Sequence, residues 1–212
     1  STTISTVEVG DAGNAAITIG EVSYGQVADA YRIGTFEVTI QQYAAFLNSV
    51  ATRPDTYSAG ASLIESLYDS RMESDKNVVG ISRSGAGTEG DGNRPIAYVT
   101  LFNAARFANW MHNGARSNSD LELGAYALSG ANSGVLTKSD GATWWIPSED
   151  EWFKAAYYKG GSTNAGYYRF PTASDSLPGN SSNTATNQAN FRRLGLYSIT
   201  QLATLSSSEN YL

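Results

Sequence analysis

Few residues of this chain are of the types that act as catalytic groups or metal ligands. Its 212 residues contain no cysteine and one histidine, so no thiolate nucleophile, thiolate zinc site or disulfide can form within them. The histidine, His112, has no serine and aspartate pattern or second histidine to support catalysis. It stands just before Gly114, where a helix would end and a positive charge would interact favourably with the helix dipole. We therefore expect His112 to have a structural role.

Three consecutive acids, Glu149, Asp150 and Glu151, admit two interpretations. A hydrolase could use two carboxylates as general acid and base, which requires Glu149 or Asp150 to line a pocket and to have a shifted pKa. Ser148 followed three residues later by Glu151 instead matches a capping box, and acids suit the positive end of a helix dipole. We favour a capped helix start.

Aromatic side chains are the other group with binding potential, since the chain has 4 tryptophans and 13 tyrosines. An aromatic ring can stack on a ligand such as a sugar, or it can pack in the core. We take Trp144, Tyr157 and Tyr158 as candidate ligand contacts. Tyr157 and Tyr158 belong to a tyrosine-rich tract that also contains Tyr167 and Tyr168.

Composition narrows the class of protein. Apolar residues make up 41% and charged residues 16%, which is typical of a globular chain and not of a disordered one. The net charge of -6 would repel phosphate backbones, so a nucleic-acid partner is not expected. No basic leader and no apolar run long enough to span a membrane is present. The length favours one domain, residues 1–212.

Three helices have clear start signals. Thr39 and Gln42 form a predicted capping box for a helix over about 40–51, with apolar residues on one face. Thr100 is a predicted N-cap for a helix that continues until Gly114, and Ser148 begins a third helix that extends to about Tyr158.

Strands are expected to be short. Alternating residues within 1–39 predict antiparallel strands, as does a hairpin that pairs 126–128 with 134–137. An aromatic strand is expected over 142–147. Two long loops, 52–94 and 160–190, are expected to supply contacts to partners, with order in the first confined to 64–68 and 78–81.

Three segments, in this order and spacing, resemble the domain of formylglycine-generating enzymes, also called sulfatase-modifying factors. The resemblance is strongest over 31–161, and the segments are IGTFEVTIQQYAAFLN at 33–48, RPIAYV at 94–99 followed by AARFANW at 104–110, and WIPSEDEWFKAA at 145–156.

The resemblance implies an α+β, irregular C-type-lectin-like fold with short antiparallel sheets, about three helices and long loops. It also implies that Trp145 and Trp152 lie inside. Residues 162–212 read as a loop-rich, incomplete C-terminal part of such a domain. Relatives with this style of loop resemble exported bacterial proteins, so we expect an extracellular or cell-surface location.

In active members of the family, a copper-binding cysteine pair near the C-terminal end oxidises a substrate cysteine to formylglycine, and calcium ligands lie nearby. The corresponding segments are absent here, so no catalytic or metal residue is carried over and no cofactor is expected within this chain. The sequence predicts a noncatalytic binding or assembly module whose partner is a glycan, a protein or another copy of itself. The alternative is a formylglycine-generating oxidase without its cysteine-containing C-terminal part.

Overall fold

The computed structural model describes residues 2–50, 66–69, 72, 81–82, 85–86, 92–179 and 186–189. The chain forms two compact units, each made of segments that are separated in the sequence. Unit 1 comprises residues 1–3 and 38–146, and unit 2 comprises residues 4–37 and 147–212. Among the helices of the described residues, none has the length and apolar character needed to cross a membrane.

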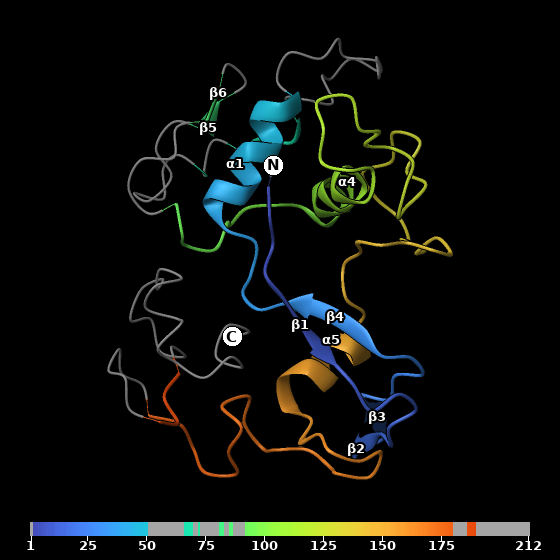
Figure 1. Cartoon of the computed structure of the whole chain (residues 1–212), viewed down its shortest axis with the longest axis vertical. Coiled ribbons are helices and arrows are strands. Elements are labelled where there is room, and N and C mark those ends of the chain that lie inside the picture. Colours follow the sequence, from blue (N-terminus) through green and yellow to red (C-terminus); the bar gives the residue numbers. More distant parts are fainter. Residues whose placement is uncertain are drawn as a thin grey trace. The chain divides into compact units, whose positions relative to one another are not determined.

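Unit 1 contains the helices α1 (Ile40–Val50) and α4 (Leu101–His112) and the two-residue strands β5 (Ile81–Ser82) and β6 (Gly85–Ala86), which pair antiparallel (Figure 1). Both helices have the boundaries that their caps predict, with α1 ending one residue early.

The start of α1 is fixed by a reciprocal capping box. The Thr39 backbone N–H donates to Gln42 Oε1 at 2.9 Å, and the Gln42 N–H donates to Thr39 Oγ1 at 3.2 Å. These two bonds satisfy backbone groups that the first turn of a helix leaves unpaired. The start of α4 is capped in a simpler way, because Thr100 accepts from the Asn103 N–H.

The core of unit 1 is aromatic where α1 meets α4. Phe46 lies edge-on to Phe107, with 5.5 Å between ring centroids, and 5.3 Å from Trp110. Tyr43, on the same face of α1, completes the cluster and is fully buried. Edge-on and tilted ring pairs of this kind add to the stabilisation that burial provides.

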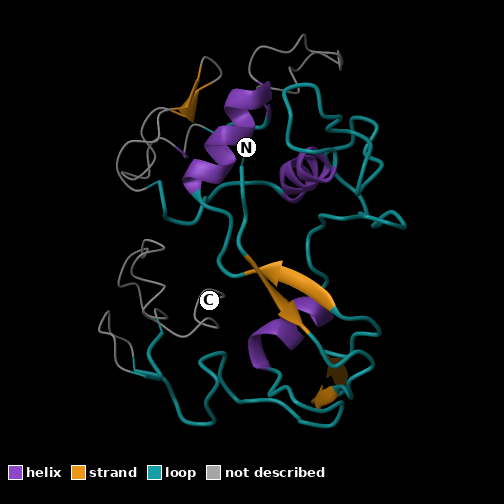
Figure 2. Ribbon diagram, in the orientation of Figure 1, coloured by secondary structure: helices purple, strands orange, loops and turns teal. Residues whose placement is uncertain are grey.

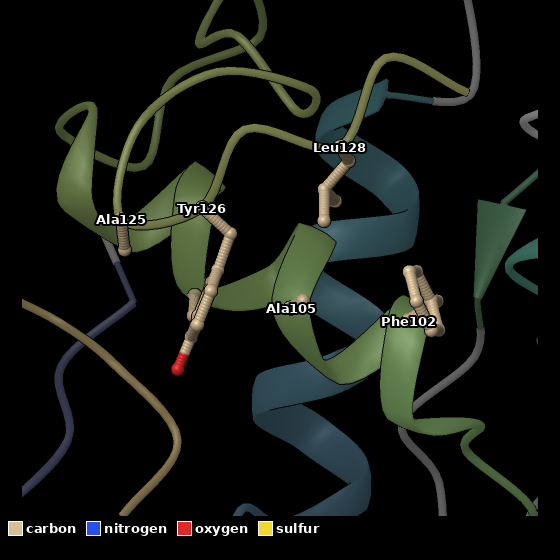
Figure 3. Close-up of a cluster of buried hydrophobic side chains, with 6 residues drawn as sticks. Phe102, Ala105, Ala125, Tyr126 and Leu128 are labelled. Atoms are coloured by element: carbon tan, nitrogen blue, oxygen red, sulfur yellow. The ribbon is translucent and has the colours of Figure 1, made fainter. Parts of the chain in front are cut away.

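A second cluster joins α4 to the loop that follows it (Figure 3). Phe102 and Ala105 of α4 pack with Ala125, Tyr126 and Leu128 of the loop. The Tyr126 hydroxyl accepts from the backbone N–H of residue 146 at 2.9 Å. The expected hairpin over 126–137 is wrong, because the structure forms one bridge there, between Tyr126 and residue 138.

A buried ion pair fixes this loop on α4. Arg106 Nε is 2.7 Å from Glu122 Oε1, and the Arg106 side chain is fully buried. Glu122 Oε2 accepts from the Gly130 N–H at 2.7 Å, and Arg106 Nη2 donates to the Ala131 carbonyl at 2.9 Å. Because both charges have further hydrogen-bond partners, the cost of burying them is offset.

The described residues of unit 2 form four strands and one helix (Figure 1). Strand β1 (Thr6–Val9) pairs antiparallel with β4 (Tyr31–Gly34), and β2 (Ile17–Ile19) pairs antiparallel with β3 (Val22–Tyr24). Helix α5 (Glu149–Tyr157) lies against β4, whose Tyr31 hydroxyl donates to the Glu151 carbonyl.

The capping box predicted for α5 is confirmed. The Ser148 hydroxyl accepts from the Glu151 N–H at 3.1 Å, and Glu151 Oε2 accepts from the Ser148 N–H at 2.8 Å. Loops dominate the described chain, with strand confined to short pieces (Figure 2). The expected aromatic strand over 142–147 is wrong, since those residues are turns and irregular chain.

The long loop expected over 52–94 lies largely outside the described residues. Within it the structure describes 66–69, 72, 81–82, 85–86 and 92–94, so the expected order over 64–68 and 78–81 is only partly tested.

Candidate ligand-binding face

After α5 the chain turns back on itself and forms a paired segment, residues 157–168, here called the tyrosine hairpin. Tyr158 and Tyr167 form an antiparallel bridge. The Lys159 N–H donates to the Gly166 carbonyl at 3.0 Å, and the Tyr168 N–H donates to the Tyr157 carbonyl at 2.8 Å. Residues directly opposite each other in such a ladder place their side chains on the same side. Tyr158 and Tyr167 therefore share one side, and Lys159 and Tyr168 share the other. Tyr157 is the last residue of α5 and stacks on Phe153, which also packs against Tyr167 at 5.5 Å.

The first side packs into unit 2. Tyr167 is 9% exposed, and its ring lies 5.1 Å from that of Tyr158 in an edge-on pair. The Tyr158 hydroxyl donates to the Ser162 carbonyl, which lies in the turn of the hairpin. Tyr158 is thus engaged with its own hairpin.

Asn14 is a buried polar residue that lies beneath the packed side of the hairpin. It is fully buried, and its amide nitrogen donates to the Tyr167 hydroxyl at 2.8 Å and to the Gly25 carbonyl at 2.7 Å. Its amide oxygen accepts from the Val27 N–H at 3.2 Å. Gly25 has φ +79°, and a Cβ there would lie 2.6 Å from the Tyr167 hydroxyl oxygen, so only glycine fits.

Lys154 ties α5 to the same loop. Its side chain is 1% exposed, and Nζ donates to the carbonyls of Gly10 at 2.7 Å and Asp11 at 3.0 Å. Burial lowers the pKa of Lys154, while the nearby Asp11 charge acts in the opposite direction. Asp11 Oδ2 in turn accepts from the Gly161 N–H at 2.8 Å, which holds the turn of the hairpin.

The second side, here called the outer face, consists of Lys159 and Tyr168. Lys159 is exposed and Tyr168 is half-buried. The Lys159 ammonium lies 4.9 Å from the centroid of the Tyr168 ring and 3.3 Å from Asp175 Oδ2. Asp175 Oδ1 accepts from the Arg169 N–H at 2.9 Å, and this bond is the main cause that lowers the pKa of Asp175.

Tyr157 is held in place by a stack of rings. It lies 4.7 Å from Phe153 at an interplanar angle of 29°, and Tyr24 of β3 stacks on Phe153 at 5.3 Å. Trp152 meets Tyr157 edge-on at 6.1 Å. Burial raises the pKa of Tyr157. Residues of α5 and β3 thus hold the Tyr157 ring in place.

The predicted contact residues lie in different places. Trp144 is half-buried in unit 1, whereas Tyr157 and Tyr158 belong to unit 2. Tyr157 ends α5 and stacks on Phe153, whereas Tyr158 lies on the packed side of the hairpin beside Tyr167. Trp145, which was expected inside, is half-buried and packs against the core cluster of unit 1 under Lys138. Trp152, which was expected inside, is half-buried.

His112 and the acids are engaged in local structure. His112 ends α4, and its Nδ1 accepts from the Thr143 N–H at 3.1 Å. Asp150 Oδ1 accepts from the Gly25 N–H at 2.8 Å, and Glu151 closes the cap of α5. Asp150 and Glu151 therefore do not point at a common reaction centre. The described residues contain no group of three or more histidine, aspartate or glutamate side chains that could hold a metal ion.

Sequence reasoning missed Lys159 and Asp175 and did not separate Tyr168 from its neighbours. A signal for the hairpin was present, because Gly160 and Gly161 follow the helix directly and lie between two tyrosine pairs. Glycine pairs favour turns, and an antiparallel return would have placed Tyr157 opposite Tyr168.

Comparison with known proteins identifies the class. Residues 7–209 match the family described as "Sulfatase-modifying factor enzyme 1-like domain". With its three described helices and short antiparallel sheets, the chain has the α+β, C-type-lectin-like fold of that family. The chain belongs to this family, and the match extends on both sides of the 31–161 resemblance. Neither a curated protein nor a solved structure matches the chain.

Proposed function

We propose that this chain is a noncatalytic binding module of the formylglycine-generating-enzyme-like family. The observation that carries the proposal is that the span matched to the family, residues 7–209, contains no cysteine. Copper oxidation of a thiol in this family depends on a cysteine pair, and Cu(I) prefers soft thiolate ligands. The family fold is thus present across a span that lacks the groups needed for the family's chemistry.

The binding role is supported by the outer face of the tyrosine hairpin. Rings that are packed from below and half-exposed above lose little conformational freedom when a ligand binds. Asn14 holds the hairpin from one side through its buried hydrogen bond to Tyr167, and Asp11 holds the turn of the hairpin by accepting from the Gly161 N–H. The proposal therefore assigns the fold the role of a rigid support for a contact surface.

We further propose that the protein acts outside the cytoplasm. Its low content of charged residues, 16%, and its loops rich in serine, threonine, glycine and asparagine are typical of exported bacterial surface proteins. Self-association through weakly charged loops is compatible with the same role.

Copper binding tests the noncatalytic proposal. We expect the 212-residue chain, titrated under reducing conditions with a coloured Cu(I) chelator complex, to leave that complex intact. Cysteine-free ligand sets hold Cu(I) weakly, so no equivalent of copper should transfer. Withdrawal of one equivalent of Cu(I) from the chelator would refute the proposal.

The second candidate is a formylglycine-generating oxidase, which family membership favours. It requires a cysteine pair outside these residues. Peptide mapping of the native protein, with its intact mass compared with the 22.6 kDa of this chain, distinguishes the two. Cysteine-containing peptides that follow residue 212 would favour the oxidase.

A further inference from the structure

Helix α4 is followed by an asparagine–glycine pair, Asn113 and Gly114, and no other asparagine of the chain precedes a glycine. Gly114 has φ +90°, the left-handed conformation in which glycine commonly ends a helix. A glycine nitrogen can attack the side-chain amide carbon of the asparagine before it, because glycine has no β-carbon to hinder the approach. The residue that ends α4 therefore also makes the Asn113 amide chemically labile.

The reaction is a deamidation in two steps. The Gly114 nitrogen loses its proton and bonds to Cγ of Asn113, the bond from Cγ to Nδ2 breaks, and ammonia leaves with a proton. The product is a five-membered succinimide. Water then adds across one of the two C–N bonds of that ring. Opening at Cγ gives aspartate, and opening at the backbone carbonyl gives isoaspartate, so water is the only co-reactant.

In the folded chain, hydrogen bonds hold both reacting groups apart. Nδ2 of Asn113 donates to the carbonyls of Asp120 at 2.9 Å and Leu123 at 2.8 Å. The Gly114 N–H, whose nitrogen would attack, donates to the Met111 carbonyl at 3.1 Å. Ring closure also requires rotation about ψ of Asn113, which is 15° in the structure, and that rotation would break the Gly114 bond.

The loop that accepts from the Asn113 amide lies close around it. A Cβ at Gly124 would lie 2.9 Å from Asn113 Nδ2, which shows how near the loop backbone comes. The Ser119 hydroxyl donates to the Asn113 carbonyl at 2.8 Å and accepts from the Arg116 N–H at 3.0 Å. Asn113 thus joins the end of α4 to residues 119–124.

We propose that Asn113 is a deamidation site which the fold protects, and that it is modified when the end of α4 opens from residues 119–124. The rate then follows the population of the locally open form. The modification opposes reclosure, because a carboxylate has no hydrogen to donate to the Asp120 and Leu123 carbonyls. A transient opening would thereby become permanent.

Peptide mapping by mass spectrometry tests the proposal on the 212-residue chain. The chain is incubated at pH 8, folded or in guanidinium chloride, and conversion of the Asn113 amide to an acid is followed. We expect conversion to be about tenfold slower or more in the folded chain. Ser119→Ala removes a bond to the Asn113 carbonyl and should speed conversion in the folded chain alone. Ser133→Ala, at an exposed position of the same unit, is the matched control.

Equal rates in the folded and unfolded chains, or in folded Ser119→Ala and wild type, would overturn the proposal. So would an unfolded chain in which Asn113 does not convert. Asn113→Asp tests the consequence, because it introduces the product carboxylate directly and should lower the midpoint of urea unfolding. Asn118→Asp adds the same charge at an exposed position nearby and should leave the midpoint unchanged. Equal midpoints for the two variants would contradict the role of the amide.

Discussion

At the scale of single residues, buried polar side chains connect segments that are far apart in the sequence. Asn14 joins three segments of unit 2 through its amide, and its partner Tyr167 is 153 residues away in sequence. Such a pairing cannot be predicted from local pattern, because neither residue carries a signal that specifies the other. The capping role of Glu151 could be assigned from sequence, since its partner Ser148 is three residues away. His112, by contrast, meets Thr143, which is 31 residues away in the sequence.

Glu37 is a residue whose burial has a measurable consequence. Its Oε2 is buried and has no hydrogen-bond partner within the described part of the chain. Burial raises the pKa of Glu37 from its ordinary 4.5 to about 7, although a backbone hydrogen bond opposes the shift. The folded state therefore binds this proton more tightly than the unfolded state.

We expect Glu37→Gln to stabilise the protein at pH 8 relative to the wild type. Below pH 4.5 the carboxyl is protonated in both states, and the free energy of unfolding falls as the pH rises from about 4.5 to 7. The loss is at most about 3.4 kcal/mol, from a shift of about 2.5 pKa units at 1.36 kcal/mol each. Urea unfolding at pH 4, 6 and 8 measures it. Glu21→Gln, at an exposed position, is the control. An equal pH dependence in Glu37→Gln and wild type would contradict the assignment.

At the scale of elements, the helices and the short antiparallel strands within 1–39 were predictable, whereas the strands expected over 126–147 were not formed as expected. All three described helices begin where a cap residue and helical spacing coincide, as at Thr39, Thr100 and Ser148. Strands depend on partners that local sequence does not name. The hairpin over 126–137 reduces to one bridge, and the 142–147 segment consists of bends and irregular chain, with Trp145 packed against the core cluster of unit 1. β3, three residues long, was missed.

The cap of α5 should be worth about 1 kcal/mol of stability, which is typical of an N-cap serine. Ser148→Ala removes the oxygen that accepts from the Glu151 N–H, so we expect it to lower the midpoint of urea unfolding. Ser148→Thr keeps a hydroxyl and is the matched control. If the alanine and threonine variants unfolded at the same urea concentration as the wild type, the capping box would not be contributing to stability.

At the scale of the whole molecule, the sequence indicated the family. It did not indicate that the chain divides into two compact units. The expectation of one domain, residues 1–212, stays a prediction. The chain forms two compact units, and the matched span 7–209 runs through both. Segments 4–37 and 147–212 form one unit although more than a hundred residues separate them, and composition carries no signal of such a pairing.

The most direct test of the central claim is an oxidation assay on the protein as it exists. The chain is preincubated with Cu(I) and supplied with oxygen and a peptide that contains one cysteine in a sulfatase-type sequence, and the peptide is followed by mass spectrometry. We predict that no formylglycine accumulates above a copper-only control, because residues 7–209 supply no thiolate to hold the metal. Catalytic conversion of the cysteine to formylglycine, at many turnovers for each chain, would contradict the account.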